Sequence, residues 1–132
     1  MSIDLAIGTF SINLAITIPP LLLIVFGVLA LMVIPKKPNW IMGYRTSRSR
    51  QNQDTWAFAH RYWGKQAIAL GIILTVLTIV GLVLIEQETF TLDPNIFLGL
   101  SAIVTVVAIT ITIIPTEIAL KREFDENGNR RQ

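Results

Sequence analysis

The segment Ala67–Ile85, AIALGIILTVLTIVGLVLI, decides the fold of this chain. It carries no charge, and as a helix its nineteen residues rise about 28 Å, close to the thickness of the hydrocarbon core of a bilayer. Two further apolar segments flank it, at about 12–34 and 96–114. A chain of 132 residues has no soluble interior large enough to bury three such runs. The sequence therefore predicts one all-α integral membrane domain, 1–132, with three transmembrane helices.

Composition narrows the class of function. Only 15% of the residues are charged, where about a quarter is usual for a soluble domain. Cysteine is absent and His60 is the single histidine, so thiolate and histidine-cluster metal sites are excluded. We find no nucleophile–base set, no phosphate-binding glycine loop and no ionisable residue in the middle of a span. The sequence predicts no enzyme, no cofactor, no metal site and no nucleic-acid partner.

Prolines and turn residues predict where the helices bend, begin and end. Pro19-Pro20 interrupts the first span and predicts a kink, which membranes tolerate when neighbours satisfy the freed carbonyl groups. A second helix beginning near Gln53 is expected to pass without a break into the second span. Asp93-Pro94-Asn95 is a start signal for the third helix. Pro115 is expected to kink or end that helix, and 117–124 to continue it amphipathically. Within the cytoplasmic tail 116–132, the turn-rich run Asp125–Asn129 is expected to be mobile.

Charge predicts the orientation. All eleven Lys and Arg residues lie within 36–65 or 121–131, whereas the N-terminus and the turn at 86–93 carry only acids. Three spans place both basic segments on one side, and the positive-inside rule makes that side cytoplasmic. We therefore expect a bacterial cell-membrane protein with its N-terminus outside and its C-terminus in the cytoplasm. The juxtamembrane cations are either topogenic charge alone or a patch that attracts anionic lipid, and they are Lys36, Lys37, Arg48, Arg50 and Lys65.

The segment 36–65 interleaves polar, aromatic and glycine residues too specifically to be membrane filler. Arg45 is always charged, so burial would require an anion, with Asp54, Glu117 or a lipid phosphate as candidates. Gly43 allows a close backbone approach or a positive φ. Trp56, His60 and Trp63 fall on one helical face, which we expect at the membrane interface, with His60 as a hydrogen-bonded surface residue.

These residues also carry a family resemblance. The pattern N-x-x-x-G-x-R-T, followed by a Trp and by R-x-x-G before an apolar helix, resembles the SdpI family of small bacterial multi-pass membrane proteins. The matching residues are Asn39, Gly43, Tyr44, Arg45, Thr46, Trp56, Arg61 and Gly64. The resemblance implies a three-helix core and an immunity-type activity, since the best-known member protects its producer from a secreted toxin peptide and relays toxin presence to a cytoplasmic regulator.

The resulting hypothesis is a binding protein of the membrane that intercepts or blocks a membrane-active toxin peptide, with a possible relay to a cytoplasmic partner. One alternative is a small oligomeric transporter or lipid-handling protein that uses the Arg45 motif for anionic head-groups. A second alternative is an accessory subunit of a larger membrane complex. Within each hypothesis, the motif either acts directly or only stabilises the fold.

Overall fold

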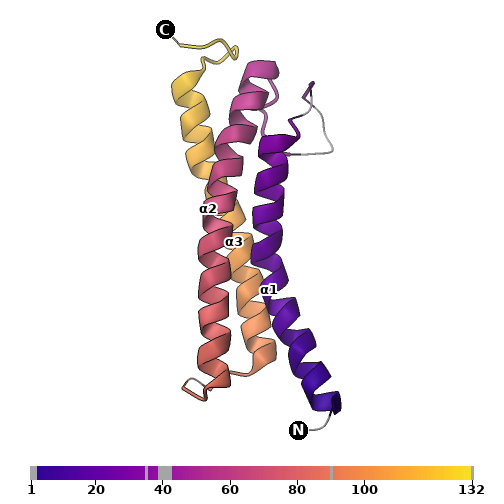
Figure 1. The fold of residues 1–132 in the computed structure, drawn as a ribbon. Helices are drawn as coiled ribbons and strands as arrows, with labels where there is room; N and C mark the ends of the chain where they lie inside the picture. The colour runs from indigo at the N-terminus through magenta and orange to yellow at the C-terminus, as the bar shows by residue number, and fades with distance from the viewer. Residues whose placement is uncertain (1–2, 35, 39–42, 90, 132) are drawn as a thin grey trace.

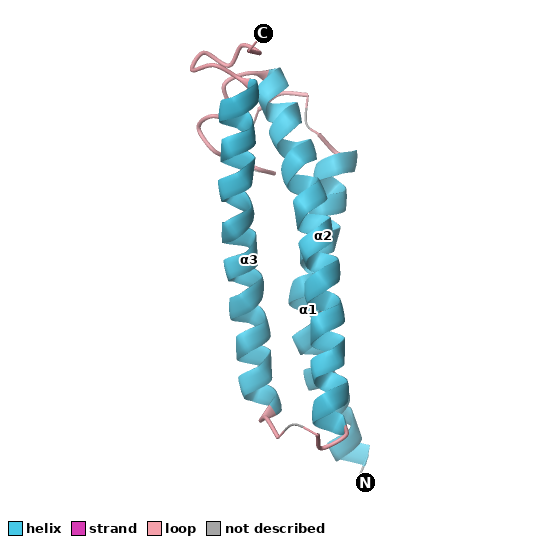
Figure 2. Ribbon diagram, turned by 90° about the vertical axis from the view of Figure 1, so that its left-hand side faces the viewer, coloured by secondary structure: helices cyan, strands magenta, loops and turns pink. Residues whose placement is uncertain are grey.

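Three long helices make up the computed structural model, which describes residues 3–34, 36–38, 43–89 and 91–131. Helix α1 spans Ile3–Met32, α2 spans Gln53–Glu86 and α3 spans Pro94–Glu123. They run side by side along the molecule, and the two termini lie at opposite ends (Figures 1 and 2). Within the described ranges, β pairing amounts to one isolated bridge between Phe124 and Arg130. The prediction of an all-α membrane protein with three transmembrane helices is confirmed.

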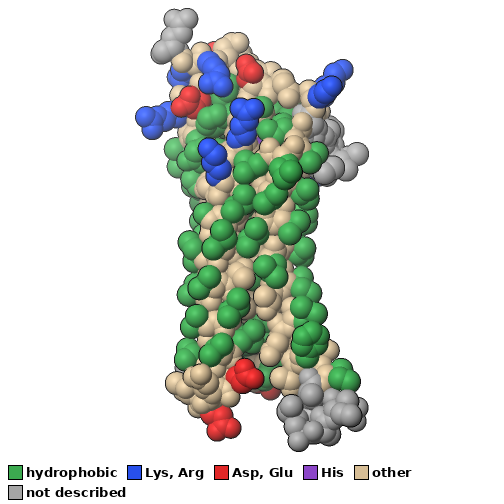
Figure 3. Space-filling model, in the orientation of Figure 1, with side chains coloured by type: hydrophobic (Ala, Val, Ile, Leu, Met, Phe, Trp, Pro, Cys, Tyr) green, Lys and Arg blue, Asp and Glu red, His purple; other side chains and the backbone are tan. Residues whose placement is uncertain are grey.

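The surface of the bundle is apolar along its middle and charged at its ends. Apolar stretches of spanning length occur in all three helices, with mean hydropathies of 2.6, 3.0 and 2.5 along the chain. Figure 3 shows hydrophobic side chains over the middle of the molecule and Lys and Arg gathered at one end. We call this the basic end; α2 begins there and α3 ends there. The opposite, acidic end carries Glu86, Glu88 and Asp93 in the α2–α3 connection.

Helix α1 continues through both of its prolines, Pro19 and Pro20. The ring of Pro20 removes the N–H that would have bonded to the carbonyl group of Ile16 four residues earlier. That carbonyl accepts a hydrogen bond from the Ser101 hydroxyl of α3 instead, at 3.0 Å. Figure 1 shows α1 bending away from the other helices toward its N-terminus. A neighbouring helix therefore satisfies a carbonyl group freed by proline, as expected, and the helix begins nine residues earlier than the predicted Ile12.

Glycines bring α1 and α2 into close contact. A Cβ atom added to Gly64 would lie 2.9 Å from the carbonyl oxygen of Gly27, and one added to Gly27 would lie 2.8 Å from that of Gly64. One added to Gly71 would lie 2.9 Å from the backbone nitrogen of Ile24. Small residues let membrane helices approach closely enough for backbone packing. Gly64 of the sequence motif thus has a packing role at the α1–α2 crossing.

The starts of α2 and α3 follow local capping. Asn52 caps α2, accepting hydrogen bonds from the backbone N–H groups of Asp54 and Thr55, while the Thr55 hydroxyl accepts from the Asn52 N–H. Asp93 caps α3 with Pro94 in its first turn. With 34 residues, α2 is about 51 Å long and exceeds the hydrocarbon thickness by several turns. The apolar part of α2 begins only after Lys65, so its first turns stand beyond the span.

The end of the chain differs from the expectation of a mobile tail. Helix α3 runs through Pro115 to Glu123, and Asp125–Arg131 forms a closed loop. The Asp125 carboxylate accepts hydrogen bonds from the backbone N–H groups of Asn127 and Asn129, and these bonds hold its pKa below the ordinary value. The loop is therefore ordered by its own acid, which turn-forming residues alone did not reveal.

Candidate functional site

The residues of the motif assemble at the basic end into a compact unit that we call the cap. It comprises the loop 43–52, the first turns of α2 up to Gln66, and the end of α3 with its closing loop, 112–131. Asn39 belongs to the predicted motif but lies outside the described residues. The remaining seven motif residues are described. Tyr44, Trp56 and Gly64 are buried and Thr46 is partly buried, whereas Gly43, Arg45 and Arg61 are exposed.

Gly43 and Tyr44 connect the loop to α2 through His60. Gly43 has a φ of 89°, which favours glycine, and its Cα lies so close to the imidazole that an added Cβ would overlap Nε2. The backbone N–H of Tyr44 donates to His60 Nε2 at 3.2 Å, while His60 Nδ1 lies 2.9 Å from the carbonyl oxygen of Trp56. Nε2 must therefore be the acceptor and Nδ1 the protonated donor, which defines a neutral imidazole.

His60 is only 1% exposed, so the prediction of a surface histidine is wrong. Burial lowers the pKa of His60 below its ordinary value, in keeping with its neutral role. Its ring lies 4.2 Å from that of Trp56, which is fully buried and whose Nε1 has no hydrogen-bond partner in the described part of the chain. The aromatic face of α2 thus packs against Tyr44 of the loop and against α3, and its position at the membrane interface stays a prediction.

Short hydroxyl side chains lock the loop itself. The Ser49 hydroxyl lies 3.1 Å from the carbonyl oxygen of Tyr44 and 3.0 Å from that of Thr46, and it can donate to either. Thr46 Oγ1 accepts from the Ser49 backbone N–H, and the Thr55 hydroxyl reaches the Ser49 carbonyl at 3.2 Å. Ser49 and Thr55 are both completely buried. Thr46 therefore helps to hold the loop in its conformation.

Tyr44 links the loop to α3. Its hydroxyl donates to Glu117 Oε1 at 2.9 Å and lies 3.3 Å from the carbonyl oxygen of Ile113. Burial of the phenol, followed by its hydrogen bond to Glu117, raises the pKa of Tyr44 far above the physiological range. The hydroxyl therefore remains a donor. Glu117, predicted as an ion-pair partner of Arg45, is joined to the motif through the neighbouring tyrosine.

Two further bonds join α2 to α3 in the cap. Trp63 Nε1 donates to Thr112 Oγ1 at 2.9 Å, and the Gln66 amide donates to Thr116 Oγ1 at 3.0 Å. Buried Tyr44, Ala59, Leu120 and Phe124 form a small apolar core, against which Phe58 and Trp63 pack. The cap thus has a hydrophobic centre and polar links on each side of it.

The C-terminal loop closes the cap over the start of α2. The side-chain amide of Asn52 donates to the carbonyl oxygen of Gly128 at 2.7 Å, and that of Gln51 donates to the carbonyl oxygen of Glu126 at 2.7 Å. The helix-capping residue Asn52 therefore also holds the end of the chain. Asn52 and Thr55 have the spacing of a capping box, which indicates the start of α2 from the sequence but not its junction with the C-terminal loop.

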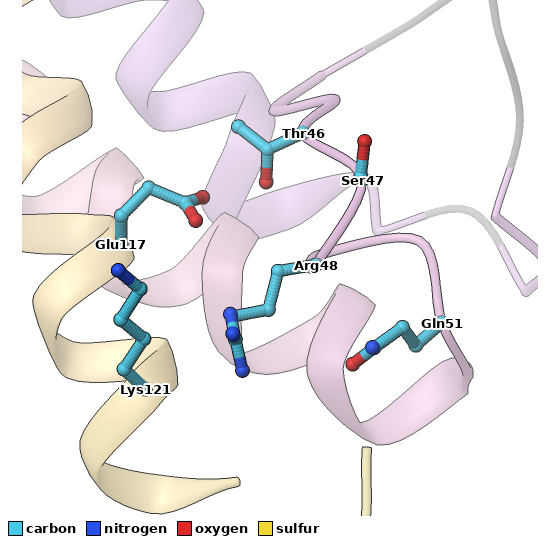
Figure 4. A pocket seen from close by; sticks show the side chains of 6 residues that line it. All are labelled: Thr46, Ser47, Arg48, Gln51, Glu117 and Lys121. Carbon is cyan, nitrogen blue, oxygen red and sulfur yellow. The ribbon is translucent and has the colours of Figure 1, made fainter. Parts of the chain in front are cut away.

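The motif arginines lie on the surface of the cap. Arg45 and Arg61 are exposed, as is Asp54. The ion pair of Arg45 with Asp54 or Glu117 stays a prediction. A recess of about 450 Å³ opens beside this loop, lined by Thr46, Ser47, Arg48, Gln51, Glu117 and Lys121 (Figure 4). Among the described residues, no three His, Asp or Glu side chains group as a metal site would require.

The fold and the cap define a class: a three-helix multi-pass membrane protein with an ordered polar cap at one end of the bundle. Residues 36–116, which include the motif, all of α2 and most of α3, match the model of the SdpI/YfhL protein family. The uncharacterized protein YfhL of Bacillus subtilis (strain 168) is 36% identical over 110 residues, which cover 83% of this chain and 89% of that protein. The chain belongs to the SdpI/YfhL family. No solved structure gives a significant match.

Proposed function

We propose that this protein confers immunity on a bacterium by binding a membrane-active toxin peptide within the bilayer. Membership in the SdpI/YfhL family, over a region that includes the loop 43–52, all of α2 and most of α3, is the observation that carries this proposal. The best-known activity in this family is protection of a toxin producer. The proposed role needs a membrane-embedded surface rather than a catalytic centre, and the bundle offers a largely apolar surface of the required length.

The proposed orientation places the basic end in the cytoplasm. It rests on the positive-inside rule, because all eleven Lys and Arg residues belong to segments at that end. A toxin peptide arriving from outside would then meet the acidic end first. Glu86 and Glu88 are exposed there, and they would attract a cationic peptide before it reaches the apolar surface.

The contact surface that we propose for the peptide is a groove between α2 and α3. It has a volume of about 170 Å³, and its walls are mainly apolar, formed by Leu74, Leu77, Thr78, Phe97, Leu100, Ser101, Val104 and Thr105. The Ser101 and Thr105 hydroxyls already donate to the carbonyl oxygens of Ile16 and Ser101. Because these groups are satisfied, the groove suits an apolar side chain of a membrane-inserted peptide.

The test is binding of a labelled family toxin peptide to the protein in lipid nanodiscs. Leu100→Trp fills the groove, and Ile103→Trp is the matched control because Ile103 is 62% exposed and does not line it. Binding by wild type and Ile103→Trp, with at least about tenfold weaker binding by Leu100→Trp, would support the proposal. Absence of binding by the wild-type protein would refute it and favour the lipid-handling or accessory-subunit hypothesis.

A further inference from the structure

The recess at the basic end is built from two separate parts of the chain. Thr46, Ser47, Arg48 and Gln51 line it from the loop before α2, whereas Glu117 and Lys121 line it from consecutive turns of α3. Figure 4 shows Arg48 and Lys121 on facing sides, with the Glu117 carboxylate beside them. With a volume of about 450 Å³, the recess is large enough for a small polar group rather than a single ion.

The charged side chains that line the recess differ in their hydrogen-bond partners. Within the described part of the chain, neither the Arg48 guanidinium nor the Lys121 ammonium makes a hydrogen bond or an ion pair. The Glu117 carboxylate, by contrast, accepts the Tyr44 hydroxyl on Oε1. Two cations and one carboxylate leave the lining with a net charge of +1. Such a lining favours an anion with a single negative charge, and Arg48 offers a planar fork that suits phosphate oxygens.

The height of the recess along α3 indicates where that anion comes from. The apolar part of α3 ends near Ile114, and Glu117 and Lys121 follow three and seven residues later. They stand about 4 and 10 Å beyond the hydrocarbon, at 1.5 Å per residue. The head-group layer on each side of a bilayer is roughly 5–8 Å thick. The recess therefore begins within the head-group layer at Glu117 and extends to its outer edge at Lys121, whose side chain reaches back toward Glu117 (Figure 4).

We propose that this recess binds the phosphodiester of a phospholipid head-group. Arg48 and Lys121 hold the phosphate oxygens, with the Ser47 hydroxyl as a third donor. Glu117 reduces the positive charge of the lining to +1 and so matches it to the single negative charge of a phosphodiester. The same carboxylate disfavours a doubly charged phosphomonoester, since it would repel the second negative charge. This site is independent of toxin binding, which the preceding proposal places within the membrane span.

The experiment is lipid retention, measured by native mass spectrometry on protein purified in mild detergent from a host rich in phosphatidylethanolamine and phosphatidylglycerol. The test variant is Arg48→Gln with Lys121→Gln. The matched control is Arg61→Gln with Lys65→Gln, which removes the same charge from exposed residues outside the recess. We expect wild type and control to retain phospholipid and the test variant to lose about tenfold or more of it.

Two further arms separate the remaining outcomes. Ser47→Phe fills the recess without changing its charge, so it should also release the lipid. Equal loss of lipid from the test variant and the matched control would overturn the proposal. A second arm tests whether free phosphate, and not a lipid head-group, is the ligand of the recess. If it is, inorganic phosphate at millimolar concentration in lipid-free neutral detergent should raise the melting temperature of wild type but not of the test variant. Protein that retains no lipid and shows no phosphate effect would likewise overturn it.

Discussion

The backbone of Gly43 lies against the imidazole of His60, and the substitution Gly43→Ala tests this contact. The φ of 89° is unfavourable for alanine, at a cost of about 1–2 kcal/mol. The new methyl group would also occupy the position of His60 Nε2 and lie 2.7 Å from Cδ2. The imidazole must then move away, which leaves the buried N–H of Tyr44 without its acceptor.

The destabilisation of the cap is the sum of the backbone strain at residue 43 and the loss of the acceptor for the Tyr44 N–H. An unsatisfied buried donor costs about 1–3 kcal/mol, so the combined destabilisation of the cap is about 2–5 kcal/mol. At 1.4 kcal/mol for each tenfold change, the equilibrium between closed and open cap should shift by about 30-fold to a few thousand-fold. The helices can remain in the membrane, because neither term involves the apolar spans.

Thiol labelling can measure this opening, because the chain contains no cysteine. Ala59→Cys places one thiol in the apolar core of the cap, where Ala59 is fully buried. When the cap recloses faster than the thiol reacts, the labelling rate is proportional to the open population. Gly99→Ala is the matched control, since a Cβ there meets nothing within 4 Å. Both substitutions are made in the Ala59→Cys protein. If Gly43→Ala is labelled within about threefold of the rate of that control, the predicted opening of the cap is wrong.

Three further perturbations address other bonds. Tyr44→Phe should destabilise the cap by about 1–2 kcal/mol, and a thermal-unfolding cycle with Glu117→Gln should show coupling between the two residues. Because burial lowers the pKa of His60, cap stability should fall as pH drops below about 6.5, and His60→Gln, which keeps an acceptor, should flatten this dependence in pH-resolved melting. A pH-independent wild type would contradict the assigned neutral imidazole. Gly64→Leu should separate α1 from α2 at Gly27 and lower the melting temperature, whereas an unchanged value would exclude tight packing there.

Local signals predicted the helices well. The predicted helix start near Gln53 and the start signal Asp93-Pro94-Asn95 agree with the observed starts of α2 and α3. The hydrogen bond from Ser101 to Ile16 follows the general expectation that another helix satisfies a carbonyl group freed by proline. These features depend on residues that are neighbours in the sequence or on the absence of water from the bilayer. They could therefore be predicted from the sequence alone.

Long-range contacts in the cap were not predictable in the same way. His60 and Trp56 formed an amphipathic stripe, but only the path of the loop determines whether that stripe faces lipid or protein. Tyr44 meets Glu117 from a position 73 residues away, and no local pattern specifies that pairing. The tail was interpreted from its turn residues, whereas its order depends on Asp125 and on docking against Asn52.

The proposed immunity function is tested most directly by survival of a susceptible bacterium. Cells expressing this chain and cells carrying an empty vector would be challenged with the family's secreted toxin peptide, after correct membrane insertion is verified. The wild-type chain and Ile103→Trp should protect the cells, whereas Leu100→Trp should not protect them at equal membrane levels. Killing of wild-type cells at the same toxin concentration as empty-vector cells would contradict the proposed function.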